Sequence, residues 1–297
     1  MPGGDTDDRE WGRMIKLFAS DLDGTLLNCF HNVDRTILAA IREAVASGAH
    51  VAVATGRTLR STSDFGFGGS GIEAVCANGS IVLDRDGRII HHGTVDPAFV
   101  EELLRAFPQV CFECVGLEHT FVTGTEEERF AGFKGDGIVK RIIMRGMRGR
   151  RQAMSADCLY SQGLSDVLAH EVCKINARVA DPALERELHA FIDAHADSVV
   201  DTPFDPVMFE ITDKDVNKGA SVAWLAGYLG ISEDEVAVYG DGGNDLAMLR
   251  RFEHAYAPSN GSDAAKEAAG SVIGSCVFHA VPRHIRATLR AQAGGRA

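Results

Sequence analysis

Short apolar runs alternate with a helical stretch in the first part of the chain. The runs are rich in small and β-branched residues and lie at 16–22, 50–56 and 72–78. Runs of this kind are typical of strands that are buried on both faces of a sheet. Between the first two runs, apolar residues recur with helical spacing over 33–47, and Gly48 follows as a stop signal.

The same alternation returns in the last part of the chain. Helical patterns occupy 218–230, 244–252 and 262–269, and strand-like runs occupy 236–239 and 254–257. Strands that alternate with helices usually join a parallel sheet with helices on both faces. Both ends of the chain therefore predict one shared α/β core.

The middle of the chain has a different pattern. Residues 80–95 are typical of a β-hairpin that turns at Asp86–Gly87. Further patterns predict a helix, two strands and a later strand–helix–strand unit, at 96–107, 110–115, 120–123 and 172–200. This mixture predicts a separate α+β unit of about 120 residues, which is a common domain size.

With 297 residues the chain is long enough for two units. The first fourteen residues are acidic and glycine-rich and lack the apolar segment of a secretion signal. The expected division is a disordered leader at 1–14, a core formed by 15–83 and 207–297, and a cap at 84–206 that ends in the stiff connector Pro203–Pro206.

The charge balance limits the partners of the protein. The chain has 42 acidic and 30 basic residues, which give a formal net charge of −12. Such a chain is a poor candidate for non-specific nucleic-acid binding, which depends on Lys and Arg contacts to phosphates. An anionic substrate would need a local cation. The basic segment Lys140–Arg151 is one source of positive charge, although a solvated basic face is the interpretation we favour.

The seven cysteines are an odd number spread through the chain, which indicates reduced thiols in a cytoplasmic protein. Cys111 and Cys114 form a C-x-x-C pair, but no second pair lies at zinc-ligand spacing, so we expect buried thiols. No apolar run approaches the roughly 18 residues that a membrane span needs.

The most informative segment is KLFASDLDGTLL at 16–27. Its strand-like run ends in Asp21 and Asp23, followed by Gly24 and Thr25. Open α/β sheets bind ligands at the carboxyl ends of their strands. Two carboxylates close together there repel each other unless a cation or a shared proton relieves the repulsion. The segment therefore predicts a divalent metal, an acid/base pair or both, with a solvated turn as the alternative.

Three further segments carry chemistry that suits the same edge of the sheet. Thr55, Gly56 and Arg57 follow a predicted strand and offer phosphate-binding donors where a helix can begin. Residues 240–245, GDGGND, place two carboxylates and an amide in a glycine-rich turn, and magnesium prefers oxygen ligands. Lys218 begins a predicted helix and offers a point charge to a phosphoryl oxygen. Helix capping by the last aspartate and solvent exposure of the lysine are the plain alternatives.

Placed at four successive strand ends of the parallel sheet, these residues predict one site for an anion and a metal. Asp21 would attack the phosphorus of a bound monoester, and Asp23 would protonate the leaving oxygen and later activate water. Thr55 and Lys218 would hold the phosphoryl oxygens while charge develops. The expected magnesium ligands are a carboxylate oxygen of Asp21, the backbone carbonyl of Asp23, Asp241, and Asp245 through a bound water.

At four places the sequence resembles the motifs of the haloacid dehalogenase-like (HAD) superfamily. They are DLDGTLL at 21–27, ATGR at 54–57, NKG at 217–219 and GDGGND at 240–245. With ANGS at 77–80, their order and spacing are similar to the Cof-type sugar-phosphatase-like branch. The resemblance implies a Rossmann-like parallel-sheet core with an inserted α+β cap.

The resemblance also implies a function and roles for individual residues. The implied function is a Mg²⁺-dependent phosphatase that hydrolyses small phosphomonoesters, such as sugar phosphates, through an aspartyl-phosphate. Asp21 would be the nucleophile, Asp23 the acid/base, and Asp241 and Asp245 the acids beside the magnesium. The implied phosphate-binding residues are Leu22, Thr55, Gly56, Lys218 and Asn244.

Two other functions stay open. A phosphomutase or phosphotransferase of the same fold would pass the phosphoryl group to a sugar hydroxyl instead of water. A non-catalytic protein that binds phosphorylated ligands would be expected to lack one of Asp21, Asp23, Lys218 or Asp241, and all four are present. The sequence does not indicate an oligomeric state.

Overall fold

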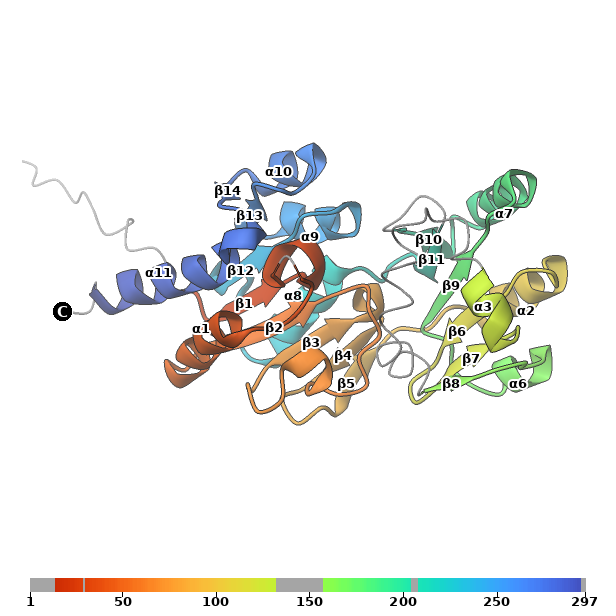
Figure 1. The fold of residues 1–297 in the computed structure, drawn as a ribbon, viewed down its shortest axis with the longest axis horizontal. Helices are drawn as coiled ribbons and strands as arrows, with labels where there is room; N and C mark the ends of the chain where they lie inside the picture. The colour runs from red at the N-terminus through yellow and green to blue at the C-terminus, as the bar shows by residue number, and fades with distance from the viewer. Residues whose placement is uncertain (1–13, 29, 132–156, 204–207, 295–297) are drawn as a thin grey trace, which may run out of the picture.

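The computed structural model describes residues 14–28, 30–131, 157–203 and 208–294. The expected leader at 1–14, apart from Met14, and the whole basic segment Lys140–Arg151 lie outside these residues, as does most of the expected connector Pro203–Pro206. Figure 1 shows two units side by side, each built around one β-sheet.

The first unit, here called the core, contains an eight-stranded sheet in the order β14-β13-β12-β1-β2-β3-β4-β5. Its parallel strands are β1 (Leu17–Ser20), β2 (His50–Ala54), β3 (Glu73–Cys76), β12 (Val236–Tyr239), β13 (His254–Pro258) and β14 (Val272–Ile273). The hairpin strands β4 (Ile81–Leu83) and β5 (Ile89–His92) extend one edge in antiparallel pairing. The predicted parallel α/β sheet is confirmed.

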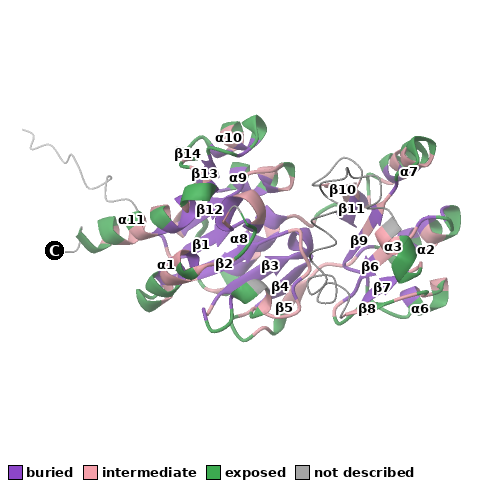
Figure 2. Cartoon of the chain, viewed as in Figure 1, coloured by how far each residue is buried: buried purple, intermediate pink, exposed green. Residues whose placement is uncertain are grey.

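Helices cover both faces of this sheet. On one face lie α1 (Arg35–Ala46) and α11 (Ala280–Gly294), packed against side chains such as Phe18. On the other lie α8 (Lys218–Tyr228), α9 (Leu246–Arg251) and α10 (Asp263–Ala269), packed against side chains such as Ala19. Because consecutive residues of a strand point to opposite faces, strands covered on both faces are buried at nearly every position, and most of these positions hold apolar residues. Figure 2 shows the strands buried beneath the helices.

The second unit, here called the cap, contains a six-stranded sheet in the order β10-β11-β9-β6-β7-β8. The strands are β6 (Phe112–Val115), β7 (Thr120–Val122), β8 (Cys158–Leu159), β9 (Lys174–Arg178), β10 (Val199–Asp201) and β11 (Met208–Asp213). The helices are α2 (Pro97–Ala106), α3 (Glu126–Ala131), α6 (Leu164–Leu168) and α7 (Pro182–Ala194). Phe99, Leu188 and Phe209 belong to an apolar cluster that joins α2 and α7 to one face of the sheet.

Strand pairing bears on the limits of the cap, which stay a prediction. The cap was expected at 84–206, but β5 pairs with β4 in the core sheet, and β11 pairs with β9 and β10 in the cap sheet. The strand pattern alone did not show which sheet each of these strands would join. We therefore propose cap limits between β5 and α2 on one side and between β11 and α8 on the other.

Three short helical turns lie at the edge of the core sheet that faces the cap. They are η1 (Leu22–Leu26), η3 (Ala77–Gly79) and η6 (Gly243–Asp245), which follow β1, β3 and β12. The helix expected to begin at Thr55–Arg57 does not form, and the next helical turn after β2 is η2 (Asp64–Gly66).

Candidate active site

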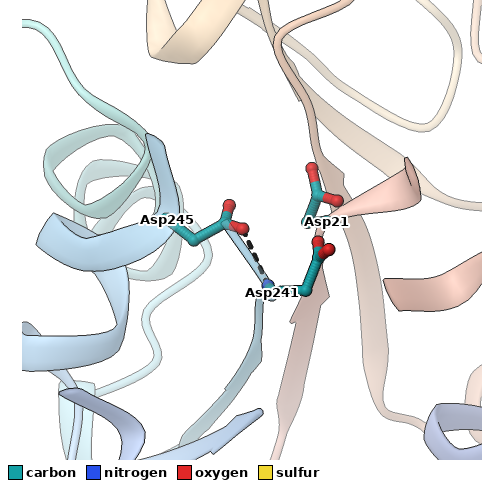
Figure 3. A group of neighbouring side chains, drawn as sticks. All are labelled: Asp21, Asp241 and Asp245. Atoms are coloured by element: carbon teal, nitrogen blue, oxygen red, sulfur yellow. Dashed lines mark hydrogen bonds between the residues drawn. The ribbon is translucent and has the colours of Figure 1, made fainter. Parts of the chain in front are cut away.

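Three carboxylates converge at the carboxyl end of β1 and β12. These strands are parallel neighbours, with Ser20 opposite Tyr239, so Asp21 and Asp241 both emerge just beyond the paired residues. Asp245 comes from η6, one turn further along the chain. One oxygen from each of the three side chains lies within 4.8 Å of the other two. Figure 3 shows the three groups turned toward a common point.

Lys218 supplies the positive charge in this cluster. Its Nζ donates to Oδ1 of Asp21 and to Oδ1 of Asp245, each at 2.7 Å, and its side chain is 0% exposed. Burial disfavours the charged ammonium, but the two carboxylates outweigh burial and hold the pKa of Lys218 above its usual value. Lys218 is therefore a buried cation. Lys218 was expected to follow a strand of the core sheet. Instead, it is the first residue of α8 and follows the cap strand β11.

The cluster remains electrostatically unbalanced with the lysine in place. Burial raises the pKa of Asp21 well above its usual value, and the neighbouring Asp245 and Asp241 raise it further, against the opposing effect of Lys218. Burial likewise raises the pKa of Asp241. Three carboxylates beside one ammonium leave an excess of negative charge that a divalent cation with a preference for oxygen ligands relieves. The donor set fits such a metal ion.

The individual carboxylates are oriented by different partners. Oδ2 of Asp245 accepts hydrogen bonds from the backbone N–H groups of Asp241 and Gly242, at 2.9 and 3.0 Å, so both of its oxygens are occupied. Oδ1 of Asp241 accepts from the hydroxyl of buried Thr25 at 2.8 Å. Asp21 uses Oδ1 for Lys218, and its Oδ2 has no hydrogen-bond partner among the residues described. That oxygen is the one available for a reaction.

Asp23 stands apart from this cluster. Its Oδ2 accepts from Nε of Arg57 at 2.6 Å, and its Oδ1 accepts from Nη2 of Arg57 and lies 2.9 Å from Nδ1 of His31. Burial alone would raise the pKa of Asp23, but the hydrogen bonds from Arg57 outweigh burial and lower it. The carboxylate of Asp23 is therefore not one of the clustered acids, which limits its expected metal role to the backbone carbonyl; that role stays a prediction.

The expected phosphate-binding residues lie at the same edge of the core sheet as the cluster. Leu22 directly follows Asp21 as the first residue of η1, and buried Thr55 follows the neighbouring strand β2. Gly56 lies against Asn78, because an added Cβ would approach Oδ1 of Asn78 to 2.7 Å. Nδ2 of Asn244 donates to that same Oδ1 at 3.3 Å. The loops after β1, β2 and β3 and the turn after β12 therefore meet at one edge of the sheet, although their roles in phosphate binding stay predictions.

Several residues of this region had no role in the sequence prediction. Thr25 lies inside the DGT motif, and this motif was the signal that could have predicted a contact between Thr25 and Asp241. His31 lies in a loop with no pattern that points to Asp23. The sequence does contain a signal for Lys174 and Glu210, because each is the one charged residue in a strand-like segment, CKINA or MFEIT.

The C-x-x-C pair does not form a disulfide. Cys111 and Cys114 are both free, and burial raises their pKa to about 11 and about 12, respectively. Cys114 is buried, as expected, whereas Cys111 is only partly buried. Within the described residues, no helix combines the length and the apolar character that crossing a bilayer requires.

The core fold, with its acidic cluster at the carboxyl edge of a parallel sheet, defines an α/β protein with a candidate metal site. The family model described as haloacid dehalogenase-like hydrolase matches residues 18–285. The chain therefore belongs to the haloacid dehalogenase-like hydrolase family, and the resemblance of its four motifs is confirmed.

Individual proteins of known name are similar to most of the chain. The chloroplastic endoribonuclease YBEY of Arabidopsis thaliana is 26% identical over 290 residues, which are 91% of this chain and 47% of that protein. The chain thus spans about half the length of this relative. The protein YcsE of Bacillus subtilis, named a 5-amino-6-(5-phospho-D-ribitylamino)uracil phosphatase, is 24% identical over 276 residues, 92% of this chain and 95% of YcsE.

The fold is also shared with solved structures. A haloacid dehalogenase-like hydrolase from Bacillus subtilis superimposes with a TM-score of 0.76 at 24% identity, over 91% of this chain and 99% of that chain. At this identity the similarity supports the fold, that is, a Rossmann-like core with an inserted α+β cap.

Proposed function

We propose that the protein is a magnesium-dependent phosphatase that hydrolyses small phosphomonoesters through an aspartyl-phosphate. The observation that carries the proposal is the pairing of Asp21 with Lys218. The nucleophile candidate has one carboxylate oxygen held by a buried ammonium at 2.7 Å and leaves the other free to react. An ammonium in contact with the nucleophile is also in reach of a phosphoryl group transferred to it.

The first chemical step forms a bond between Asp21 and phosphorus. A carboxylate oxygen of Asp21 attacks the phosphorus, and the bond from phosphorus to the leaving oxygen breaks. Asp23 gives a proton to that oxygen. Because Arg57 keeps Asp23 ionised in this structure, proton uptake by Asp23 requires that its contact with Arg57 loosens. The ammonium of Lys218 and the hydroxyl of Thr55 stabilise the charge on the phosphoryl oxygens.

The second step releases phosphate. Asp23, ionised again, takes a proton from water, and the water oxygen attacks the phosphorus and breaks its bond to Asp21. The backbone N–H groups of Leu22 and Gly56 and the amide of Asn244 complete the set of donors around the phosphate. The products are inorganic phosphate and the free carboxylate of Asp21.

Magnesium is the cofactor that the donor set favours. A carboxylate oxygen of Asp21, the backbone carbonyl of Asp23, and Asp241 would hold it, with Asp245 acting through a water because its own oxygens are already hydrogen-bonded. When bound, the ion neutralises charge on the carboxylates and on the phosphate. The net negative charge of the protein then no longer opposes an anionic substrate.

Small metabolites are the proposed substrates. The cap sheet lies against the loops that carry the expected phosphate-binding residues, since Lys174 of the cap donates to the carbonyl of Gly56 at 3.0 Å. A cap at this position leaves little room for a macromolecule. YcsE, which is named as a phosphatase of a phosphoribitylamino compound, supports substrates of this size. A cytoplasmic location stays a prediction from the odd number of cysteines.

A panel of sugar phosphates, polyol phosphates and cofactor-precursor phosphates, assayed with and without Mg²⁺, tests the proposal. We expect release of inorganic phosphate from at least one compound, its loss on chelation, and its loss in Asp21→Asn. Isomeric sugar phosphate without phosphate release would favour a phosphomutase. Binding of phosphate esters with no turnover of any compound would favour a non-catalytic protein. If Asp21→Asn turned over substrate at the wild-type rate, Asp21 would not be the nucleophile.

A further inference from the structure

A buried ion pair in the cap sheet faces the site. Lys174 lies on β9 and Glu210 on the neighbouring strand β11, and Nζ of the lysine lies 2.5 Å from Oε1 of the glutamate. Their side chains are 1% and 8% exposed. Neighbouring positions of both strands, such as Ile175 and Ile211, point to the opposite face, into the apolar cluster of the cap. The pair therefore belongs to the polar face of the cap sheet.

Each member of this pair has a second hydrogen bond, and both of these bonds cross to the core. Nζ of Lys174 donates to the backbone carbonyl of Gly56 at 3.0 Å. Oε2 of Glu210 accepts from Nδ2 of Asn78 at 3.1 Å. Gly56 and Asn78 lie in the loops after β2 and β3, next to the predicted phosphate site.

Asn78 also forms hydrogen bonds with two residues that are expected to bind phosphate. Its backbone N–H donates to the carbonyl of Thr55 at 3.1 Å, and its side-chain Oδ1 accepts from Asn244 at 3.3 Å. The residue is 3% exposed and has a left-handed backbone, with φ of +58°. A connected set of hydrogen bonds thus runs from Glu210 of the cap through Asn78 to Thr55 and Asn244.

We propose that Lys174 and Glu210 are positioning residues for phosphoryl transfer, which hold the phosphate-binding loops of the core in their reactive arrangement. The inference rests on the proposed phosphatase function and names cap residues that act on the same site. A buried ion pair is a weak source of stability, because desolvation offsets the attraction between its charges. Replacement of such a pair by apolar side chains of similar volume is often neutral for stability. What they would lack is the pair of hydrogen bonds to Gly56 and Asn78.

Replacement of both charges separates this role from a structural one. In Lys174→Met or Glu210→Leu alone, one buried charge loses its partner, so the midpoint of urea unfolding should fall. In Lys174→Met/Glu210→Leu, the midpoint should lie above those of the two single variants, because no buried charge is left without its partner. The kcat on the best substrate of the panel should stay about 10- to 100-fold low in the double variant, with a smaller change in KM, because misplaced catalytic groups lower the rate of the bound complex.

Asn78→Gly provides a second, independent variant. Glycine adopts a left-handed backbone without strain, so this change removes the connecting amide and keeps the turn. We expect a similar fall in kcat. Because both changes break the same connection, adding Asn78→Gly to the double variant should lower kcat by less than the product of the separate effects.

Glu73→Gln is the matched control. Glu73 is also a buried glutamate in ion pairs, with His50 and Arg85, but it lies at the opposite end of β3 from the site. Its substitution should lower the unfolding midpoint and leave kcat of the folded protein unchanged.

The outcomes are distinct. Wild-type kcat in a folded Lys174→Met/Glu210→Leu variant, or multiplicative effects with Asn78→Gly, would overturn the positioning role while the phosphatase proposal stands. If the double variant does not fold, wild-type kcat in Asn78→Gly alone overturns it. If the wild-type protein turns over no compound, the phosphatase proposal fails first. Calorimetry with inorganic phosphate and Mg²⁺ then decides the positioning role, since unchanged phosphate affinity in the double variant or in Asn78→Gly would refute it.

Discussion

Nζ of Lys218 lies 2.7 Å from Oδ1 of Asp21, although 197 positions separate the two residues in the chain. The whole cap is inserted between them. Lys218 is placed where the chain leaves cap strand β11 and begins α8, with Asn217 capping the helix through a 2.9 Å bond from the backbone N–H of Ala220. The site is therefore complete only when the chain has returned from the cap to the core.

Removal of this ammonium should destabilise the protein as well as inactivate it. In Lys218→Met, the carboxylates of Asp21 and Asp245 stay buried without their cation, and loss of one partner of a buried pair typically costs about 3–5 kcal/mol, so we expect a loss of that size. Urea unfolding in the absence of magnesium measures it. Lys214→Met is the control, because Lys214 is 43% exposed and pairs with a solvated aspartate. Equal unfolding midpoints for the two variants would contradict this account.

Thr25 should control the affinity for magnesium through Asp241. Its hydroxyl donates to Oδ1 of Asp241 at 2.8 Å, and partners of this kind typically change metal affinity about 10- to 100-fold. Thr25→Val removes the donor at nearly constant volume, so the Mg²⁺ concentration for half-maximal activity should rise about 10-fold or more. Thr25→Ser keeps the hydroxyl and should stay near wild type. Indistinguishable magnesium titrations of the valine and serine variants would show that the hydrogen bond does not tune the site.

Gly24→Ala should lower activity strongly for a steric reason. Gly24 has φ of +79°, and an added Cβ would clash with the carboxylate of Asp241. Displacement of a catalytic group by about 1 Å can cost about 100-fold in rate. Gly48→Ala is a matched control, since Gly48 has φ of +90° but no atom within 4 Å of an added Cβ. Both variants carry the same type of backbone strain, so only a much larger loss of phosphate release in Gly24→Ala supports the clash.

The part of the site that the sequence predicted depends on strand direction. Asp21 and Asp241 follow apolar runs that became neighbouring parallel strands, and the carboxyl ends of parallel strands meet at one edge. That rule needs only the order of strands and helices. It does not apply to Lys218, whose preceding strand β11 joined the antiparallel cap sheet, so the expected strand-end position of this residue was wrong even though it does contact Asp21.

The contacts that the sequence did not predict depend on how the two units pack together or on side-chain rotamers. Arg57 follows a strand and was expected to serve phosphate, but its guanidinium binds Asp23. Lys174 and Glu210 lie on cap strands, and their partners Gly56 and Asn78 lie in the core. The pattern of apolar and polar residues does not predict which loops of the core pack against the polar face of the cap sheet.

Asp34 connects the first helix to the C-terminal part of the chain. Its carboxyl group should make the free energy of unfolding depend on pH in the acid range. Its Oδ1 accepts from the backbone N–H groups of Thr36 and Ile37 at the start of α1, and its Oδ2 lies 2.6 Å from Nε2 of His279. Burial opposes ionisation, but the hydrogen bonds from His279, Asn28 and the backbone outweigh it and lower the pKa of Asp34 to about 2, from an ordinary value of 3.8.

The direction of this pH effect follows from the lowered pKa. An acid whose pKa is lower in the folded state stabilises the fold above its unfolded value, and this stabilisation is lost as the pH falls through the folded value. An asparagine side chain at this position would still cap the helix but could not ionise, so Asp34→Asn isolates the charge. At about pH 6 the substitution should cost about 1–2 kcal/mol, after allowance for the partial exposure of Asp34.

Urea unfolding of the wild-type protein and of Asp34→Asn, at a series of pH values from neutral to acid, measures this contribution. The difference between the two proteins should shrink below about pH 3.8 and approach zero only below about pH 2, where the carboxyl group is protonated in both the folded and the unfolded states. A difference that stays constant over this range would mean that the variant acts through packing and that the charge of Asp34 contributes nothing.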